Sequence, residues 1–137
     1  MAVGTVTLTQ LPKKSVNGSV MNVYQIDWTS TAGGAASDLL KIYGYLIKAI
    51  TVPSATVAPT ALYDITLVDS IGLNLDAARS LLIDRSATLT EEVYGLAKNG
   101  ADVASTPLYL CGDYTFTVAN AGSAKAGTCY LFCKDDL

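Results

Sequence analysis

Apolar and polar side chains alternate along much of this chain with a period of two residues. In the clearest stretch, Tyr24, Ile26 and Trp28 fall on one side, whereas Gln25 and Asp27 fall on the other. Because successive side chains of a β-strand point to opposite faces of a sheet, this alternation predicts a strand with one apolar face. Such a strand covers a protein core with one side and meets water with the other.

Further β-prone stretches recur along the chain, and Gly, Pro, Asn and Ser, which favour turns, separate them. The Asn17-Gly18 pair predicts a tight hairpin turn. Residues 1–19 are therefore interpreted as an N-terminal strand or arm followed by a turn. The predicted strands cover residues 3–11, 20–29, 42–52, 62–69, 91–96, 108–118 and 128–132.

One segment, residues 73–84, is ambiguous. Leu73, Ala77 and Leu81 follow one another at the spacing of a helix, which allows one or two helical turns. The chain as a whole predicts seven or eight strands and at most one short helix. With 137 residues, this predicts an all-β chain with a single domain over residues 1–137, folded as a β-sandwich or jelly roll.

The most apolar predicted strand carries apolar side chains on both of its faces. Tyr43, Tyr45 and Ile47 lie on one face, and Ile42 and Leu46 lie on the other. Two interpretations are open: the strand is buried on both sides, or one face of its sheet is given to a partner.

The last two predicted strands are expected to form a hairpin, because residues 120–123 supply turn chemistry between them. A turn centred near Gly122 places Cys111 opposite Cys133. This pair is either a disulfide that joins the terminal strands or two small buried apolar side chains. We favour the second interpretation, because three cysteines do not make the disulfide framework of a secreted domain.

The composition predicts contact with other protein subunits. Half of the residues are apolar, only 15% are charged, and the mean hydropathy is +0.35. No stretch reaches the ~18 apolar residues of a membrane-spanning helix, so no membrane partner is expected. A monomeric domain usually carries more surface charge. We therefore expect that a homo-oligomer or a larger particle covers part of the apolar surface.

The charge distribution argues against nucleic-acid binding. The net charge is −3, and the nine Lys and Arg are scattered, apart from Lys13-Lys14, rather than gathered in a basic stripe. The N-terminal residues lack the basic and apolar regions of a signal peptide. We expect the chain to stay where it is made unless it leaves within a larger object.

The chain has no histidine, which removes the commonest general base and the commonest metal ligand. Triads of the Ser–His–Asp type are therefore excluded. Asp64, Asp69 and Asp76 lack the dense spacing of a calcium-binding loop. We expect no catalytic residue, no cofactor and no metal site.

Four residues are candidates for a contact surface: Trp28, Tyr43, Tyr45 and Lys48. Tyr and Trp are enriched in the centres of protein interfaces. The alternative is that the aromatic residues belong to an ordinary core and that the lysine stem lies along apolar surface.

Several segments in a fixed order resemble small structural proteins of tailed bacteriophages that are encoded among the head and head–tail genes. The resemblance extends over roughly residues 20–133, although Leu81-Leu82 and the cysteine-bearing final strand do not match. The segments that carry it are residues 44–53, residues 63–69, Arg85-Ser86 with Glu91, residues 114–122 and residues 126–128.

The resemblance implies a virion component that assembles in the host cytoplasm. The role it implies first is capsid decoration, in which a β-sandwich cement protein sits as an oligomer on the major capsid protein or other virion subunits. A connector, tail or fibre-associated virion component is the alternative. A carbohydrate- or receptor-binding β-sandwich is a further one, which an exposed Trp28 or exposed tyrosines over a shallow groove would favour.

Overall fold

A computed structural model describes residues 4–16, 19–69, 85–94, 96–98 and 104–135. These residues form strands and connecting loops without a helix, so the predicted all-β class is confirmed. Residues 73–84, the ambiguous segment, lie outside the described residues. The described strands are β1 (Thr5–Gln10), β2 (Lys14–Val16), β3 (Ser19–Thr29), β4 (Ala36–Pro53), β5 (Asp64–Asp69), β6 (Glu91–Tyr94), β7 (Leu96–Lys98), β8 (Ala104–Ala119) and β9 (Ala126–Lys134).

The strands number nine in this part of the chain, against the seven or eight expected, and β2 and β7 have only three residues each. All pairings are antiparallel, and the main path runs β1-β3-β9-β4-β8-β5. β2 pairs with β3, β6 with β4 and β7 with β8. Val16 pairs with Ser19, which confirms a hairpin around Asn17-Gly18.

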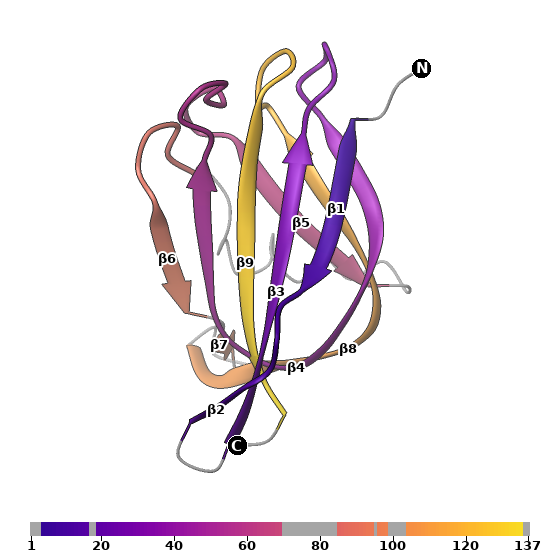
Figure 1. Cartoon of the computed structure of the whole chain (residues 1–137), viewed down its shortest axis with the longest axis vertical. Coiled ribbons are helices and arrows are strands. Elements are labelled where there is room, and N and C mark those ends of the chain that lie inside the picture. The colour runs from indigo at the N-terminus through magenta and orange to yellow at the C-terminus, as the bar shows by residue number, and fades with distance from the viewer. Residues whose placement is uncertain (1–3, 17–18, 70–84, 95, 99–103, 136–137) are drawn as a thin grey trace.

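The long strand β4 belongs to two layers. Its residues 36–46 pair with β8, whereas its residues 45–53 pair with β9. We name β1, β3, β9, β6 and residues 45–53 of β4 the front layer, and residues 36–46 of β4, β8 and β5 the back layer. Figure 1 shows β9 in front, between β3 and the second half of β4, with β5 and β8 behind.

The two layers pack against each other as a β-sandwich. The ring of Trp28 on β3 lies 5.4 Å from the ring of Tyr63, which immediately precedes β5. In the sheet order, three strands separate β3 from β5, so these rings meet only because the sheet folds back on itself. The core between the layers comes from both of them; among its members are Tyr24, Ile26, Trp28, Leu40, Ile42, Ile65, Leu110, Phe116, Cys129 and Leu131.

Gly44 and a β-bulge mark the point where β4 changes layers. Gly44 has φ = 120°, which a residue with a Cβ rarely adopts, and the pairing with β9 shifts between Leu46 and Lys48. The bulge adds one residue to β4, so the inward-facing side chains change from even to odd positions. Ile42 is therefore buried before the bulge and Ala49 after it. The strand is therefore not buried on both sides, and this interpretation of its sequence was wrong.

The predicted hairpin between the last two strands is also wrong. β8 pairs with β4, β5 and β7, whereas β9 pairs with β3 and β4. The connection between them passes from the back layer to the front layer, although Asn120 and Gly122 have the positive φ values of turn residues. The turn chemistry is therefore present, but it joins strands of different layers.

Candidate functional site

The outer face of the back layer carries the candidate site. β4 and β8 are neighbours there, and alternate side chains point away from the core toward solvent. We name eight of these residues the aromatic face; in register pairs they are Leu39 and Thr115, Lys41 and Asp113, Tyr43 and Cys111, and Tyr45 and Tyr109.

Large apolar side chains of this face are open to solvent. Leu39, Tyr43 and Tyr109 are 59%, 47% and 51% exposed, and Cys111 is also exposed. These three are half of the six large apolar residues that are exposed in the described part of the chain. Exposed apolar side chains that gather on one surface indicate a site of interaction with another molecule.

The side chains of the aromatic face contact one another within their rows. The rings of Tyr45 and Tyr109 meet edge to face, with 4.7 Å between their centroids. Lys41 Nζ lies 3.1 Å from Asp113 Oδ1, and this hydrogen bond and the charge of Asp113 raise the pKa of the lysine. The face therefore presents one ammonium group and one carboxylate among aromatic and aliphatic side chains.

Two core tyrosines fix the backbone under the centre of the face. The Tyr24 hydroxyl accepts a hydrogen bond from the Tyr43 amide at 3.2 Å and lies 3.4 Å from the Tyr43 carbonyl oxygen, to which it donates. The Tyr114 hydroxyl accepts from the Cys111 amide at 2.8 Å. Burial raises the pKa of Tyr24, so this hydroxyl keeps its proton to a higher pH than an exposed tyrosine does. The exposed Tyr43 and Cys111 thus stand on a backbone that is held from below.

Of the predicted contact residues, Tyr43 and Tyr45 lie on the aromatic face, but Trp28 does not lie on any surface. Trp28 is only 2% exposed and packs in the core against Tyr63. Its register partner is Gly127, where a Cβ would come within 2.7 Å of the indole ring. The absence of a side chain at Gly127 makes room for the indole, and the prediction of Trp28 as a contact residue was wrong.

Lys48 lies apart from these tyrosines, on the outer face of the front layer. Its Nζ sits 4.8 Å from the centre of the Phe132 ring and 3.2 Å from Glu92 Oε1. A cation placed over an aromatic ring is attracted by the electrons of that ring. Lys48 therefore covers an apolar side chain of its own layer, which agrees with the alternative interpretation of this residue.

Six members of the aromatic face were not among the predicted contact residues: Leu39, Lys41, Tyr109, Cys111, Asp113 and Thr115. The predicted strand began at residue 42, so Leu39 and Lys41 were left outside it. The structure begins this strand at Ala36. The pairing of Lys41 with Asp113 follows from the register of two strands that are distant in the chain, and a local pattern does not contain that register.

The predicted cross-strand pair of Cys111 and Cys133 is contradicted. Cys111 is exposed and pairs with Tyr43, whereas Cys133 is buried between Asn22 and Leu46 in the front layer. Both thiols are free. The interpretation as a small buried apolar side chain fits Cys133 and fails for Cys111. Burial raises the pKa of Cys133 to about 12, so its thiol is neutral at physiological pH.

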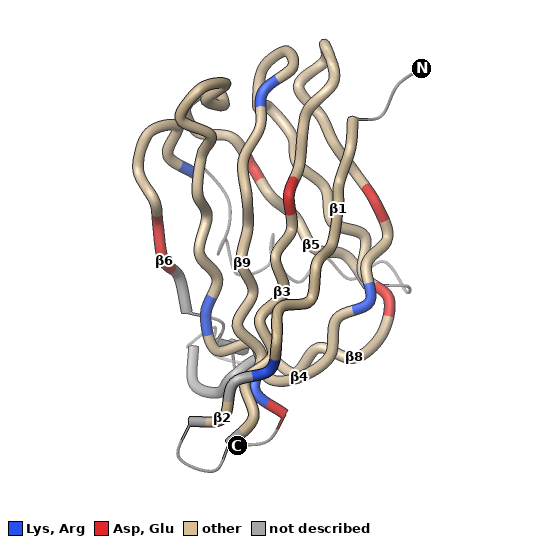
Figure 2. Tube along the Cα trace, in the orientation of Figure 1, with Lys and Arg blue, Asp and Glu red and all other residues tan. Residues whose placement is uncertain are grey.

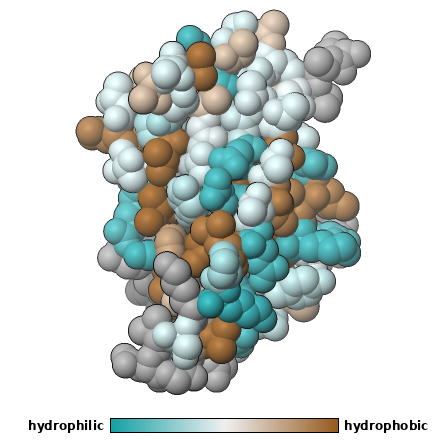
Figure 3. Space-filling view, viewed as in Figure 1, coloured by the Kyte–Doolittle hydropathy of each residue, from teal (hydrophilic) through white to brown (hydrophobic). Residues whose placement is uncertain are grey.

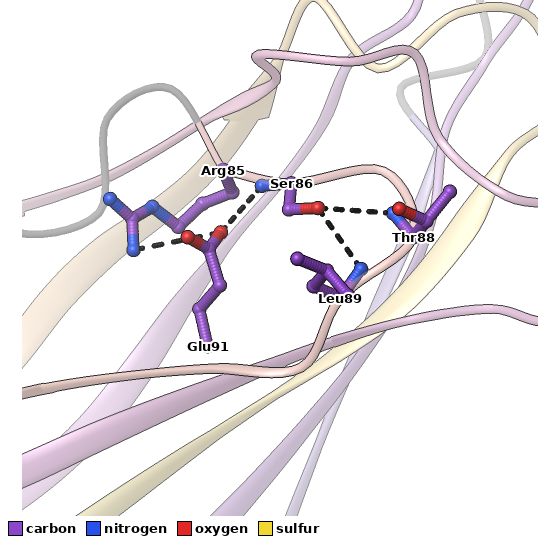
Figure 4. Close-up of polar contacts among 5 residues, drawn as sticks. All are labelled: Arg85, Ser86, Thr88, Leu89 and Glu91. Carbon is purple, nitrogen blue, oxygen red and sulfur yellow. Dashed lines mark hydrogen bonds and ion pairs between the residues drawn. The ribbon is translucent and has the colours of Figure 1, made fainter.

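The segment from Arg85 to Glu91 is held by a local network (Figure 4). The Ser86 hydroxyl accepts hydrogen bonds from the amides of Thr88 and Leu89, and the Glu91 carboxylate accepts one from the Ser86 amide. Glu91 Oε1 also lies 3.9 Å from Arg85 Nη1. These contacts close a turn before β6, so the Arg-Ser and Glu motif has a structural role here.

Figure 2 shows that charged residues are distributed over the trace of the described residues and do not gather in one place. These residues contain no group of His, Cys, Asp and Glu that could hold a metal ion. Of the three carboxylates considered for calcium, Asp64 accepts a hydrogen bond at 2.7 Å from the side-chain amide of Asn120. Asp76 lies outside the described residues. No helix long and apolar enough to cross a bilayer is found in the described chain.

Comparison with known proteins adds no relative. No model of a protein family matches this sequence, and a search of curated proteins finds no significant match.

Proposed function

We propose that this chain is a structural subunit of a virus particle, a decoration or cement protein that binds the assembled shell of a tailed bacteriophage. The observation that carries the proposal is the aromatic face: exposed Leu39, Tyr43 and Tyr109 on a backbone that Tyr24 and Tyr114 hold from the core. A fixed apolar surface suits lasting contact with neighbouring subunits, because little conformational freedom is lost on binding.

A second region also offers surface with little charge. The loops at the upper end of the molecule in Figure 3 are pale, since they consist largely of Gly, Ala, Ser and Thr. Val57, Leu62 and Leu89 are exposed on the loops between β4 and β6. A subunit packed among others has use for more than one apolar contact region.

The mechanism is mass action. A protein that binds the assembled shell, and not its dissociated subunits, shifts the equilibrium toward the shell. Each copy contributes modestly, and the repeated lattice multiplies the contribution because many contacts act together. No bond is made or broken in this mechanism, which agrees with a chain that lacks histidine.

The test begins with the number of copies in purified particles, measured by gel densitometry against the major shell protein. A decoration protein is present in numbers comparable to the shell subunits, whereas a few copies per particle would indicate a connector or tail component instead. Particles that lack the protein should rupture at a lower temperature, and addition of the purified protein should restore their resistance. Equal heat resistance with and without it would overturn the proposal.

A variant with a matched control connects this test to the aromatic face. Tyr43→Ser with Tyr109→Ser should restore less heat resistance than the native chain at the same concentration. Thr7→Ala, an exposed substitution on β1, is the control and should restore resistance in full. If the double variant is folded and protects as well as the native chain, the aromatic face has no part in the function.

A further inference from the structure

We infer that the aromatic face binds a second copy of this chain, in a two-fold symmetric dimer whose axis runs along the strands, between β4 and β8. This inference goes beyond the proposed function, because it concerns the purified chain and needs no particle. It rests on the order of charged and aromatic residues across the face.

The face is chemically complementary to itself. Lys41 and Asp113 are partners in one row, and Tyr43 and Cys111 are partners in the next. The side chains of the charged pair are 72% and 40% exposed, so both charges can be reached by another molecule. A surface that carries both signs side by side can match its own copy, whereas a surface of one sign repels its copy.

The arrangement of the two strands determines which symmetry axis matches these charges. Rotation by half a turn about an axis parallel to the strands, in the plane of the interface, exchanges β4 with β8. Lys41 then lies opposite Asp113 of the second copy, and Asp113 lies opposite Lys41 of that copy. By the same rotation, Tyr43 comes opposite Cys111 of the second copy, and Tyr45 opposite Tyr109 of that copy.

The other simple axis in the interface, at right angles to the strands, is unfavourable. Centred on the charged row, it places Lys41 against Lys41 of the second copy and Asp113 against Asp113 of that copy. Like charges that face each other across an interface are repelled, and this repulsion excludes wrong arrangements. The charges therefore favour the axis along the strands.

The apolar side chains hold the two copies together, and the charges determine how the copies are oriented. Leu39, Tyr43 and Tyr109 are each about half exposed. Packing of two such faces removes apolar surface from water on both copies, and aromatic side chains at the centre of an interface contribute strongly. The hydrogen bonds of Tyr24 and Tyr114 to the backbone beneath hold the face ready to bind.

The experiment is a charge exchange between two variants, followed by sedimentation. Lys41→Asp alone and Asp113→Lys alone should each raise the dimer Kd at least about tenfold, because each places like charges opposite each other. A mixture of the two variants should dimerise as the native chain does, since every carboxylate then faces an ammonium group of the other variant. The ion pair within each variant stays broken in the mixture, so recovery reports contact between chains.

Lys48→Asp is the matched control, because it breaks an ion pair on the front layer and should leave dimerisation unchanged. A second readout uses Cys111, the one exposed thiol among the three cysteines. A maleimide should modify it readily in dilute native protein and slowly at concentrations where the dimer forms. Circular dichroism of each variant confirms that its strands are intact.

The inference is overturned if the native chain remains monomeric up to about 1 mM, since a dimer with a Kd below that concentration is then ruled out. It is also overturned if the folded single variants dimerise as well as the native chain, or if their mixture fails to recover. The two proposals share the aromatic face but are tested apart: dimerisation is measured on the purified chain, and shell binding is measured by copy number and particle rupture.

Discussion

Apolar side chains on the outer faces of the two layers differ in how far other side chains cover them. On the front layer, Lys48 lies over the Phe132 ring and pairs with Glu92. On the back layer, Tyr43 and Tyr109 remain about half exposed. Among the residues whose side chains the structure describes, exposed large apolar side chains occur on the back layer and on loops, and none is found on β1 or β9 of the front layer.

Polar side chains extend this difference. On the front layer, the two oxygens of the Asp27 carboxylate accept hydrogen bonds from Thr128 and Gln25, at 2.7 and 3.0 Å. On the back layer, Lys41 and Asp113 pair with each other but cover no aromatic ring that the structure records. The charged side chains of the two layers therefore have different partners. On the front layer, side chains of the same layer cover Phe132 and bond Asp27, whereas on the back layer Leu39, Tyr43 and Tyr109 are left about half exposed.

The largest predicted effect is on alkaline unfolding. The two layers should differ in it, because Cys133 of the front layer is buried whereas Cys111 of the back layer is exposed. The folded pKa of Cys133, in the front layer and buried, is raised to about 12, and that of Tyr63 is also raised to about 12. The unfolded chain loses these protons near pH 9 and pH 10, the ordinary values. Because the folded state keeps protons that the unfolded state releases, the free energy of unfolding should fall as the pH rises from about 9 to about 12.

Urea titrations between pH 8 and about pH 11 measure this loss. Cys133→Ala should be less stable at pH 8 because it leaves a small cavity, but its stability should fall less steeply with pH. Cys111→Ala removes a surface thiol of the back layer and is the control, because it keeps the buried thiol; its stability should fall more steeply with pH than that of Cys133→Ala. An unchanged slope in Cys133→Ala would show that this thiol is not buried as described.

A smaller effect is expected at Gly44, where β4 passes from one layer to the other, and Gly112 of β8 serves as the comparison. Gly44 and Gly112 both have positive φ, 120° and 109°. A Cβ at Gly44 would lie 3.0 Å from the Lys134 carbonyl oxygen and 3.1 Å from Cys133 Cβ, whereas a Cβ at Gly112 meets nothing within 4 Å. Gly112→Ala should cost about 1–2 kcal/mol from backbone strain alone.

Gly44→Ala should cost about 1–3 kcal/mol more than this, because it adds crowding to the same strain. Chemical denaturation of both variants gives the difference directly. Equal costs would mean that β4 does not approach β9 at Gly44 as closely as the structure shows.

The smallest effect compares one aromatic residue from each outer face. Phe132→Ser should lower the free energy of unfolding by about 1–2 kcal/mol, because the ring is less exposed than that of Tyr43 and lies under Lys48. Tyr43→Ser should change it by less than about 0.5 kcal/mol in dilute protein, since the side chain is about half exposed. Equal losses in dilute protein would remove the distinction between the two faces.

Local chemistry in the sequence was enough to predict the elements that depend on adjacent residues. The alternation of Tyr24, Ile26 and Trp28 against Gln25 and Asp27 gave the correct strand and the correct division of its faces. The Asn17-Gly18 pair gave the β2–β3 hairpin because turn and partners are adjacent in the chain. Trp28 was nevertheless named a contact candidate because Trp is enriched in interfaces, although the same alternation places it with Tyr24 and Ile26 on the core side.

The remaining features depend on partners that are distant in the chain. Turn residues near Gly122 are compatible with a hairpin and with a connection between layers, and only the competition of β3 and β4 for β9 decides between them. The bulge after Leu46 imitates a strand with two apolar faces, because it shifts the alternation by one residue. The aromatic face was predicted only in Tyr43 and Tyr45, since its other members need the register of β4 with β8.

The position of β9 has a consequence for synthesis of the protein. β9 lies between β3 and β4 in the sheet, yet it follows every other described strand along the chain. A ribosome therefore releases β3 and β4 well before the strand that joins them. In this interval, two strand edges in the nascent chain still await their partner, and such edges readily pair with other chains. We expect nascent chains crowded on one messenger to be the form of this protein that is most prone to aggregate.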